Sequence, residues 1–284
     1  MLPVENATVV ARDVSKTFMV GKGGRKALPW QKGNISVPAL RDINLVARRG
    51  QCIGVIGKNG SGKSTLMRLL SGAEAPTTGD VLVSGKPTLL SVNAALQNQL
   101  DAETNIRLGL MAMGLSNEKA AGLIPDILEW TELQEAIGRP IATFSSGMRA
   151  RLKFGIATAV RREILLVDEA LSTGDSSFTE KAEERMRGFL EAAGTVFIVS
   201  HSSSTIRKFC NRAIWLHEGE MIADGDTEFI TKTYLSWSRN VADGMQERAN
   251  ELIQNRKDDI TKATILFDRE VAKYLEKPSQ IMLS

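Results

Sequence analysis

Residues 57–65 read GKNGSGKST, and they follow directly on the apolar stretch QCIGVI at 51–56. This is the complete pattern G-x-x-x-x-G-K-[ST], placed between a strand and a helix as a phosphate-binding loop requires. Its glycines let the backbone turn with several N–H groups pointing inward, and a helix that begins near Lys63 directs its positive end at the same point. The stretch therefore predicts a nucleoside triphosphate site.

The residues of this loop have individual predicted roles. Lys63 supplies a mobile positive charge for the β and γ phosphates, and the Ser64 hydroxyl is suited to ligate Mg²⁺. We expect nucleotide contacts along the whole loop, from Gly57, Lys58, Asn59, Gly60, Ser61, Gly62, Lys63, Ser64 and Thr65.

The composition is ordinary for a soluble protein, with 43% apolar and 24% charged residues among 284. We expect no membrane-spanning helix, which needs roughly 18 consecutive apolar residues, and no signal peptide in residues 1–20. A net charge of +3 is too small to indicate a nucleic-acid partner. Cys52 and Cys210 have no metal-site spacing, so both are expected to be packed, reduced thiols.

The distribution of charge is more informative than its sum. The sequence has no acid between Asp13 and Asp42, and its glycines there indicate a flexible loop. The bases of this segment are Lys16, Lys22, Arg25, Lys26, Lys32 and Arg41. Two interpretations remain open: a solvated hairpin loop, or contact with anionic lipid headgroups at about 1 kcal/mol per basic residue.

Strand-length apolar segments recur along the chain, at 7–11, 43–47, 51–56, 81–83, 164–168, 195–199 and 213–216. Helical patterns at 63–71, 149–161 and 179–193 alternate with the later ones, which favours a mainly parallel sheet covered on both faces. From about 93 to 150 we expect an inserted helical subdomain, because glycines and prolines break that stretch into helices without convincing strands.

The last part of the chain, 237–284, is expected to be a separate helical extension of the domain at 1–236. Its apolar residues recur at three- and four-residue steps, which predicts one or two amphipathic helices ending before Pro278. Docking of this stripe on its own domain and pairing with another chain are both compatible with the pattern.

EILLVDEA at 163–170 places two carboxylates at the end of a buried strand. Asp168 is suited to hold Mg²⁺, directly or through a water molecule. Glu169, one residue further, is suited to polarise an attacking water as a general base.

Two more motifs follow the same logic. FSSGMRARL at 144–152 puts Ser145, Ser146 and Gly147 ahead of a helix, where they form either a second phosphate-binding nest or an ordinary helix cap. The apolar strand TVFIVS at 195–200 leads directly to His201.

With these motifs in order, residues 7–236 resemble the ATP-binding subunits of ABC transporters. More narrowly, the chain is similar to the ATPases that export lipid-linked cell-surface polysaccharides such as teichoic acids, O-antigens, capsules and galactan. The narrower resemblance rests on the S-S-G-M signature followed by R-A-R-L, on the Gly-Asp turn of DEALSTGD, and on the segment SVNAALQNQLDAETNIRLGLMAMG at 91–114.

The resemblance implies an α/β fold: a P-loop NTPase core of the RecA type with an antiparallel β subdomain, an inserted α-helical subdomain and a C-terminal helical tail. It also implies that residues 145–147 are the signature, usually L-S-G-G-Q, and that the turn at 173–175 is the D-loop. His201 then senses the γ-phosphate of ATP. The aromatic residue that stacks on adenine is Phe18, with Trp30 as the alternative.

For assembly, the resemblance implies a homodimer that closes head to tail around two ATP molecules with Mg²⁺. Two copies of an integral-membrane permease hold it at the cytoplasmic face of the cell membrane, in peripheral contact with the bilayer, and a lipid-linked polysaccharide is transported. The alternatives are an ABC subunit for another lipid or a drug, and a non-transport ABC ATPase. A single compact set of motifs disfavours the latter, and no nucleic-acid partner is expected.

Two departures from the family pattern stand out. The glutamine that usually touches Mg²⁺ falls on Val92 or Asn93, and neither Gln97 nor Gln99 can be assigned its role. The tail holds only about 48 residues, whereas a carbohydrate-binding β-sandwich needs roughly 100. We therefore expect no glycan selection by an appended domain.

Overall fold

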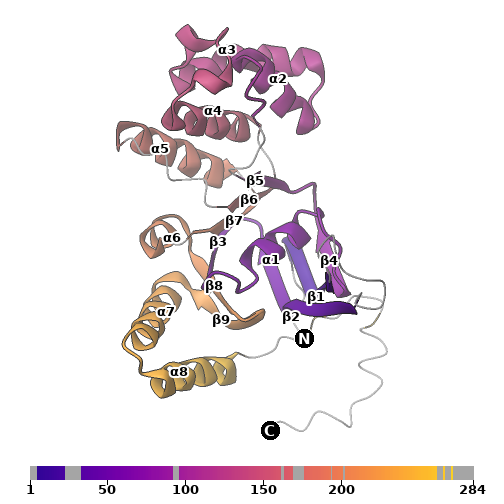
Figure 1. Ribbon diagram of the computed structural model, residues 1–284, viewed down its shortest axis with the longest axis vertical. Helices are drawn as coiled ribbons and strands as arrows, with labels where there is room; N and C mark the ends of the chain where they lie inside the picture. The colour runs from indigo at the N-terminus through magenta and orange to yellow at the C-terminus, as the bar shows by residue number, and fades with distance from the viewer. Residues whose placement is uncertain are drawn as a thin grey trace.

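The computed structural model describes residues 5–22, 33–91, 96–160, 163–168, 176–192, 194–200 and 202–260, together with residues 265 and 270. Two β-sheets lie at its centre, with a helical subdomain at one end and the C-terminal helices at the other (Figure 1). The smaller sheet is antiparallel, in the order β2–β1–β4. Its strands are β1 (Ala7–Lys22), β2 (Gly33–Arg48) and β4 (Thr78–Val83).

The larger sheet has the order β5–β6–β7–β3–β8–β9, and all its pairs are parallel except β8 with β9. The strands are β3 (Gln51–Ile56), β5 (Thr88–Ser91), β6 (Ile164–Asp168), β7 (Thr195–Val199), β8 (Arg212–His217) and β9 (Glu220–Asp226). Its central strands are continuous apolar runs because parallel strands are covered on both faces.

Side chains of the central strands point alternately to two separate cores. In β6, Ile164 and Leu166 face the first core, whereas Leu165 and Val167 face the second. Helix α1 (Lys63–Leu70) fills the first core, between the two sheets (Figure 1). The expected sheet with helices on both faces is therefore confirmed.

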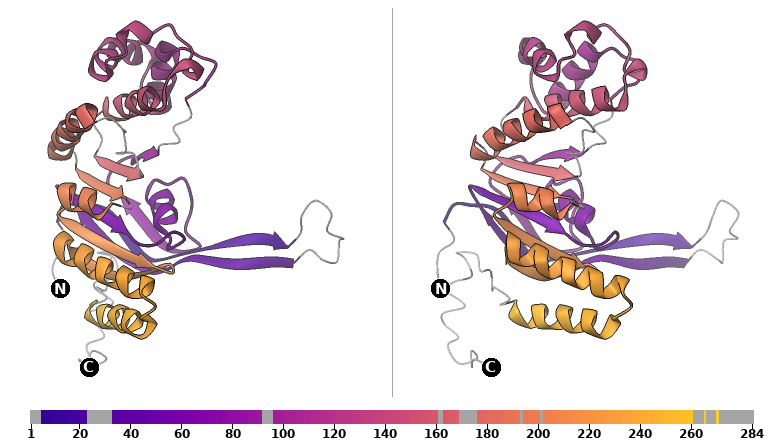
Figure 2. Two further views of the ribbon diagram at one scale, coloured as in Figure 1. Left: turned by 60° about the vertical axis from the view of Figure 1, so that its left-hand side comes forward. Right: turned by 90° about the vertical axis from the view of Figure 1, so that its left-hand side faces the viewer.

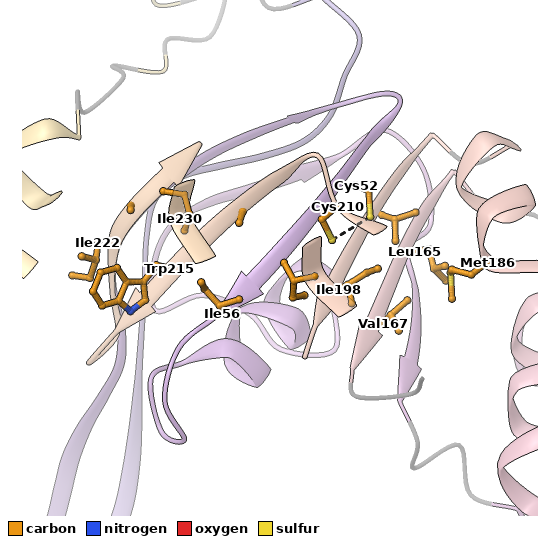
Figure 3. Close-up of a cluster of buried hydrophobic side chains, with 14 of the residues drawn as sticks. Cys52, Ile56, Leu165, Val167, Met186, Ile198, Cys210, Trp215, Ile222 and Ile230 are labelled. Carbon is orange, nitrogen blue, oxygen red and sulfur yellow. Dashed lines mark hydrogen bonds between the residues drawn. The ribbon is translucent and has the colours of Figure 1, made fainter. Parts of the chain in front are cut away.

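The second core lies on the opposite face of the parallel sheet (Figure 3). The helices that cover it are α5 (Ser176–Ala192), α6 (Ser203–Phe209), α7 (Thr227–Ala242) and α8 (Gln246–Asp259). Cys52 and Cys210 lie in this core as free thiols with their sulfur atoms 3.4 Å apart. The hydrogen bond with Cys52 and burial raise the pKa of Cys210. Both thiols are packed and free of a disulfide, as predicted.

The inserted helical subdomain follows β5 and ends before β6. Its helices are α2 (Ala102–Ala112), α3 (Asn117–Thr131) and α4 (Ser146–Thr158), with short 3₁₀ turns η2 (Gln134–Ala136) and η3 (Ile141–Thr143). It has its own hydrophobic core. Trp130 of α3 stacks on Phe154 of α4 and meets Phe178 of α5 edge to face, which joins the subdomain to the main domain.

The basic segment is more ordered than a flexible loop over much of its length. β1 extends to Lys22 and β2 begins at Gly33, so both strands run well into the segment that we interpreted as a loop. Together they form a hairpin arm, residues 16–22 and 33–41, that projects away from the rest of the molecule (Figure 2). The strands continue because Phe18 pairs with Val37 and Val20 pairs with Ile35, β-branched and aromatic residues suited to a ladder.

Two strands, β5 and β9, were not predicted.

At the other end of the chain, α7 runs unbroken across residues 236 and 237, where we placed the start of the extension. Val241, Leu252 and Ile253 pack against the second core. The part of the extension that the structure describes therefore docks on its own domain, whereas Pro278 lies outside the described residues.

Among the described residues, no helix combines the length and the apolar character that crossing a membrane requires.

Candidate functional site

The loop at 57–65 connects β3 to α1 through a turn with very little space. Gly57 has a φ angle of 149°, and a Cβ atom there would lie 2.2 Å from the Leu216 carbonyl oxygen. Gly62 has a φ angle of 102°, and a Cβ atom there would lie 2.7 Å from the Ala39 carbonyl oxygen. Both positions therefore require glycine on grounds of conformation and of space.

The Lys63 ammonium group lies inside this turn. Its side chain is buried, and Nζ donates hydrogen bonds to the carbonyl oxygens of Gly57 at 2.7 Å and Lys58 at 2.9 Å. The positive charge is thus held at the N-terminal end of α1, whose first turn contains no acidic residue. This arrangement favours an anion in front of the loop.

The hydroxyl groups of the loop are placed differently. Ser61 is buried, and its Oγ atom has no hydrogen-bond partner among the described residues. Ser64 is exposed at the second position of α1, and Thr65 is partly buried. An anion with its metal ion fits this donor set: backbone N–H groups, an ammonium group and an accessible hydroxyl.

The parallel sheet brings the second motif to the same edge. Asp168 in β6 pairs with Val199 in β7, and Val199 pairs with Val55 in β3, two residues before Gly57. With strands about 4.8 Å apart, Asp168 is roughly 10 Å across the sheet from the loop. A metal ion between them would have Ser64 on one side and Asp168 on the other. The Asp168 side chain, Glu169, His201 and the turn at 173–175 lie outside the described part of the structure.

Phe18 lies on the hairpin arm, partly buried, with Lys16 Nζ 5.0 Å from the centre of its ring. A half-open ring with an adjacent cation suits stacking against a base with phosphates nearby. Trp30, the alternative, is outside the described residues.

The signature residues lie in another part of the chain. Ser145 caps α4 by accepting a hydrogen bond from the Met148 N–H at 3.2 Å, and Ser145 and Ser146 are exposed. Helix α4 packs on α2, α3 and α5, whereas α1 packs on β2, β4 and β6. Figure 1 shows α4 beyond the β5 edge of the sheet and α1 between the sheets. A single chain thus holds the loop at 57–65 and the segment at 145–147 apart.

The segment after β5, where the family usually has its glutamine, is described only from residue 96 onward. Val92 and Asn93 are not described, but Gln97 is, and its backbone is held by Asn105 of α2. The side chains of Gln97 and Gln99 are exposed on the helical subdomain. Among the described residues, neither side chain forms a hydrogen bond with the loop at 57–65.

Sequence reasoning missed one direct contact of the loop. Lys58 Nζ lies 4.7 Å from the ring centre of Trp237 in α7. The N–H of Gly219, in the turn between β8 and β9, also donates to the Ser61 carbonyl oxygen at 3.2 Å. Nothing in the local pattern around Trp237 indicates this contact, because it joins residues that are far apart in the chain.

Comparison with known proteins agrees with this geometry. The model of the ABC transporter family matches residues 40–172. A Staphylococcus haemolyticus protein described as teichoic acids export ATP-binding protein TagH is 35% identical over 234 residues, covering 81% of this chain and 88% of that relative. Proteins of the same description from Lactococcus lactis and Bacillus cereus are 39% and 36% identical, over 74% and 81% of this chain.

The chain spans less than half the length of the latter two relatives, 46% and 42%. Among solved structures, a dimeric ATP-binding cassette in a post-hydrolysis state with ADP and Pi superposes with a TM-score of 0.64. It is 24% identical in sequence, and the match covers 77% of this chain and 98% of that structure. This likeness supports the fold described above.

We expect Lys63→Ala to weaken ATP binding about 10- to 100-fold, since hydrogen bonds to a charged group are worth roughly 1.5–3 kcal/mol. The measurement is a titration with a fluorescent ATP analogue. Arg68→Ala is the matched control, because Arg68 is an exposed cation on the same helix. Equal loss of affinity in both variants would contradict a specific role for Lys63.

Proposed function

The chain belongs to the ABC transporter family, and from this premise we propose that it binds and hydrolyses ATP to drive export of a lipid-linked cell-surface polysaccharide. The observation that carries the proposal is the loop at 57–65, with buried Lys63 held at the start of α1. The teichoic acid type of substrate is supported by the descriptions of the relatives in Staphylococcus, Lactococcus and Bacillus.

The chain's own residues divide the proposed reaction between them. Phe18 stacks on the adenine ring, and Lys63 with the N–H groups of the loop binds the phosphates. Ser64 and Asp168 would hold Mg²⁺, and the ion would neutralise charge that develops on the phosphates. Glu169 takes a proton from the attacking water, and His201 contacts the γ-phosphate.

The active form is proposed to be a homodimer in which each ATP lies between two chains. The support is the separation of the two phosphate-binding motifs, since Ser145 and Ser146 are exposed on a helix that packs away from α1. A second chain, turned head to tail, supplies its own exposed α4 terminus to the loop of the first.

The membrane partner is proposed to be an integral-membrane permease, present in two copies at the cytoplasmic face of the cell membrane. Support comes from apolar side chains exposed on the helical subdomain, among them Leu100, Leu108 and Met111. Leu108 and Met111 are three residues apart on α2 and so share a face of the helix. A coupling segment of the permease would bury this face.

Peripheral contact with the bilayer is proposed for the hairpin arm. Val20 and Ile35 are exposed on the two strands of the arm, and in the sequence they flank the basic residues Lys22, Arg25, Lys26 and Lys32. Apolar side chains beside several positive charges suit an anionic lipid surface.

Glu169→Gln keeps the shape of the side chain but removes the base. Loss of a general base costs typically 10²- to 10⁴-fold in rate, so phosphate release should fall by that factor while ATP binding persists. Steady-state phosphate release and analogue binding are measured on the same preparation. Hydrolysis within about threefold of the unaltered protein would exclude Glu169 as the base.

A mixed dimer tests whether the signature acts across the interface. One chain carries Lys63→Ala and the other Ser145→Arg, purified through two different tags. If the signature works in trans, both changes fall in one composite site and the other site stays intact, so hydrolysis is retained. Each variant as a homodimer should be inactive and serves as the control. A mixed dimer as inactive as the homodimers would overturn the head-to-tail arrangement.

Replacing Lys22, Arg25, Lys26 and Lys32 with Gln should weaken sedimentation with anionic vesicles at least about 10-fold at low salt. The difference should shrink as salt screens the charges. The control has the same charge change at exposed sites elsewhere: Lys119, Arg187, Lys232 and Arg248 to Gln. If both sets bind vesicles alike, the arm has no special affinity for lipid.

A further inference from the structure

The phosphate-binding loop has a side-chain anchor outside its own motif. Lys58, the second residue of the loop, is exposed, but its ammonium group lies over the face of Trp237, 4.7 Å from the ring centre. Trp237 belongs to α7 and is 2% exposed. A cation over an indole face is attracted by the negative face of the ring, and the attraction is stronger where water is excluded.

Trp237 is itself held in place by other rings. Its ring centre lies 5.3 Å from that of Trp215, 5.0 Å from His217 and 5.6 Å from Tyr234. Burial lowers the pKa of His217, which favours the neutral ring, a form without a charge that would repel Lys58. The Trp237 indole is thus held in place by rings from both β8 and α7.

The position of Lys58 matters because its carbonyl group organises the loop. This oxygen accepts hydrogen bonds from Lys63 Nζ at 2.9 Å and from the Ser61 N–H at 3.2 Å. Fixing the Lys58 side chain restricts the rotation of the peptide that carries this carbonyl. A contact on α7 thereby fixes the resting position of the ammonium group that meets the phosphates.

A second connection leads from α8 to the same loop. Lys257 of α8 forms an ion pair with Glu220, which also pairs with Arg41 at 3.6 Å. Glu220 adjoins Gly219, whose N–H bonds to the Ser61 carbonyl oxygen. Helices α7 and α8 are therefore both connected to the loop, α7 through Lys58 and α8 through the turn between β8 and β9.

We propose that Trp237 is a positioning residue for ATP binding, through which the C-terminal helices hold the phosphate-binding loop ready for the nucleotide. The proposal rests on the proposed function in that it takes ATP as the ligand of the loop. Trp237 is anchored beneath the loop by other rings, so it acts through Lys58 rather than by contact with ATP.

The test is a double-mutant cycle on the affinity for a fluorescent ATP analogue. Trp237→Leu removes the ring face, Lys58→Met removes the cation, and the double variant removes both. We expect each single change to weaken binding about 3- to 10-fold. The double variant should bind the analogue no more weakly than the single variant with the lower affinity, because both changes break the same contact.

Further variants separate positioning from a general loss of packing. Trp237→Phe keeps a ring face and should lose no more than about twofold in affinity. Trp130→Leu removes a comparable ring, whose centre lies 4.4 Å from the guanidinium carbon of Arg185. This change should leave the affinity for the analogue unchanged. In hydrolysis, Trp237→Leu should raise KM while kcat stays within about twofold.

Two results would overturn the proposal: unaltered affinity in folded Lys58→Met, or single effects that multiply in the double variant. If Trp237→Leu does not fold, Lys58→Arg takes its place, because it keeps a cation for the ring: it should retain most of the affinity that Lys58→Met loses, and an equal loss in both variants overturns the proposal. Failure of the proposed function looks different. In that case the unaltered protein does not bind the analogue, and Lys63→Ala makes no difference.

Discussion

The close approach of the phosphate-binding loop to the Leu216 carbonyl oxygen is the constraint on which the rest of the site depends. At Gly57 a single added carbon atom would lie 2.2 Å from that oxygen. On its other side the loop meets the antiparallel sheet, because a Cβ atom on Gly62 would lie 2.6 Å from Leu40. The loop is therefore shaped by both sheets at once, and it keeps its geometry only while the two are packed together through α1.

The elements that could be predicted from the sequence are those whose cause is local. Strands such as β6 and β7 are short apolar runs buried on both faces, and the loop at 57–65 is defined by its own residue types. The sequence does not predict β5, because Thr88–Ser91 is short. It does not predict β9, because Glu220–Asp226 contains glycine and acidic residues, a composition typical of turns. The hairpin arm was misread for the same reason: its glycines suggested a loop, whereas pairing between strands decided the structure.

In the candidate site, too, the sequence predicts local motifs but not contacts between distant segments. The loop motif predicted Lys63, the carboxylates after the strand at 164–167 predicted Asp168, and the resemblance to ABC transporters implied the role of Ser145. Parallel register places Asp168 on the edge that carries the loop. The contact of Lys58 with Trp237 joins residues 179 positions apart (237 − 58). No pattern within a window of sequence contains such a pair. Its existence depends on the docking of α7 against β8, a consequence of the whole fold.

The hairpin arm has a further consequence, for solubility. β4 pairs with β1 only from Val9 to Ser15, so beyond that point both outer edges of the arm offer backbone N–H and C=O groups to any strand that approaches. Met19, Val20, Ile35 and Val37 are exposed there as well. Two arms could pair edge to edge, but the segment between Asp13 and Asp42 carries only positive charges, which repel one another. The basic residues thus act as protection against aggregation, and this protection weakens as ionic strength rises.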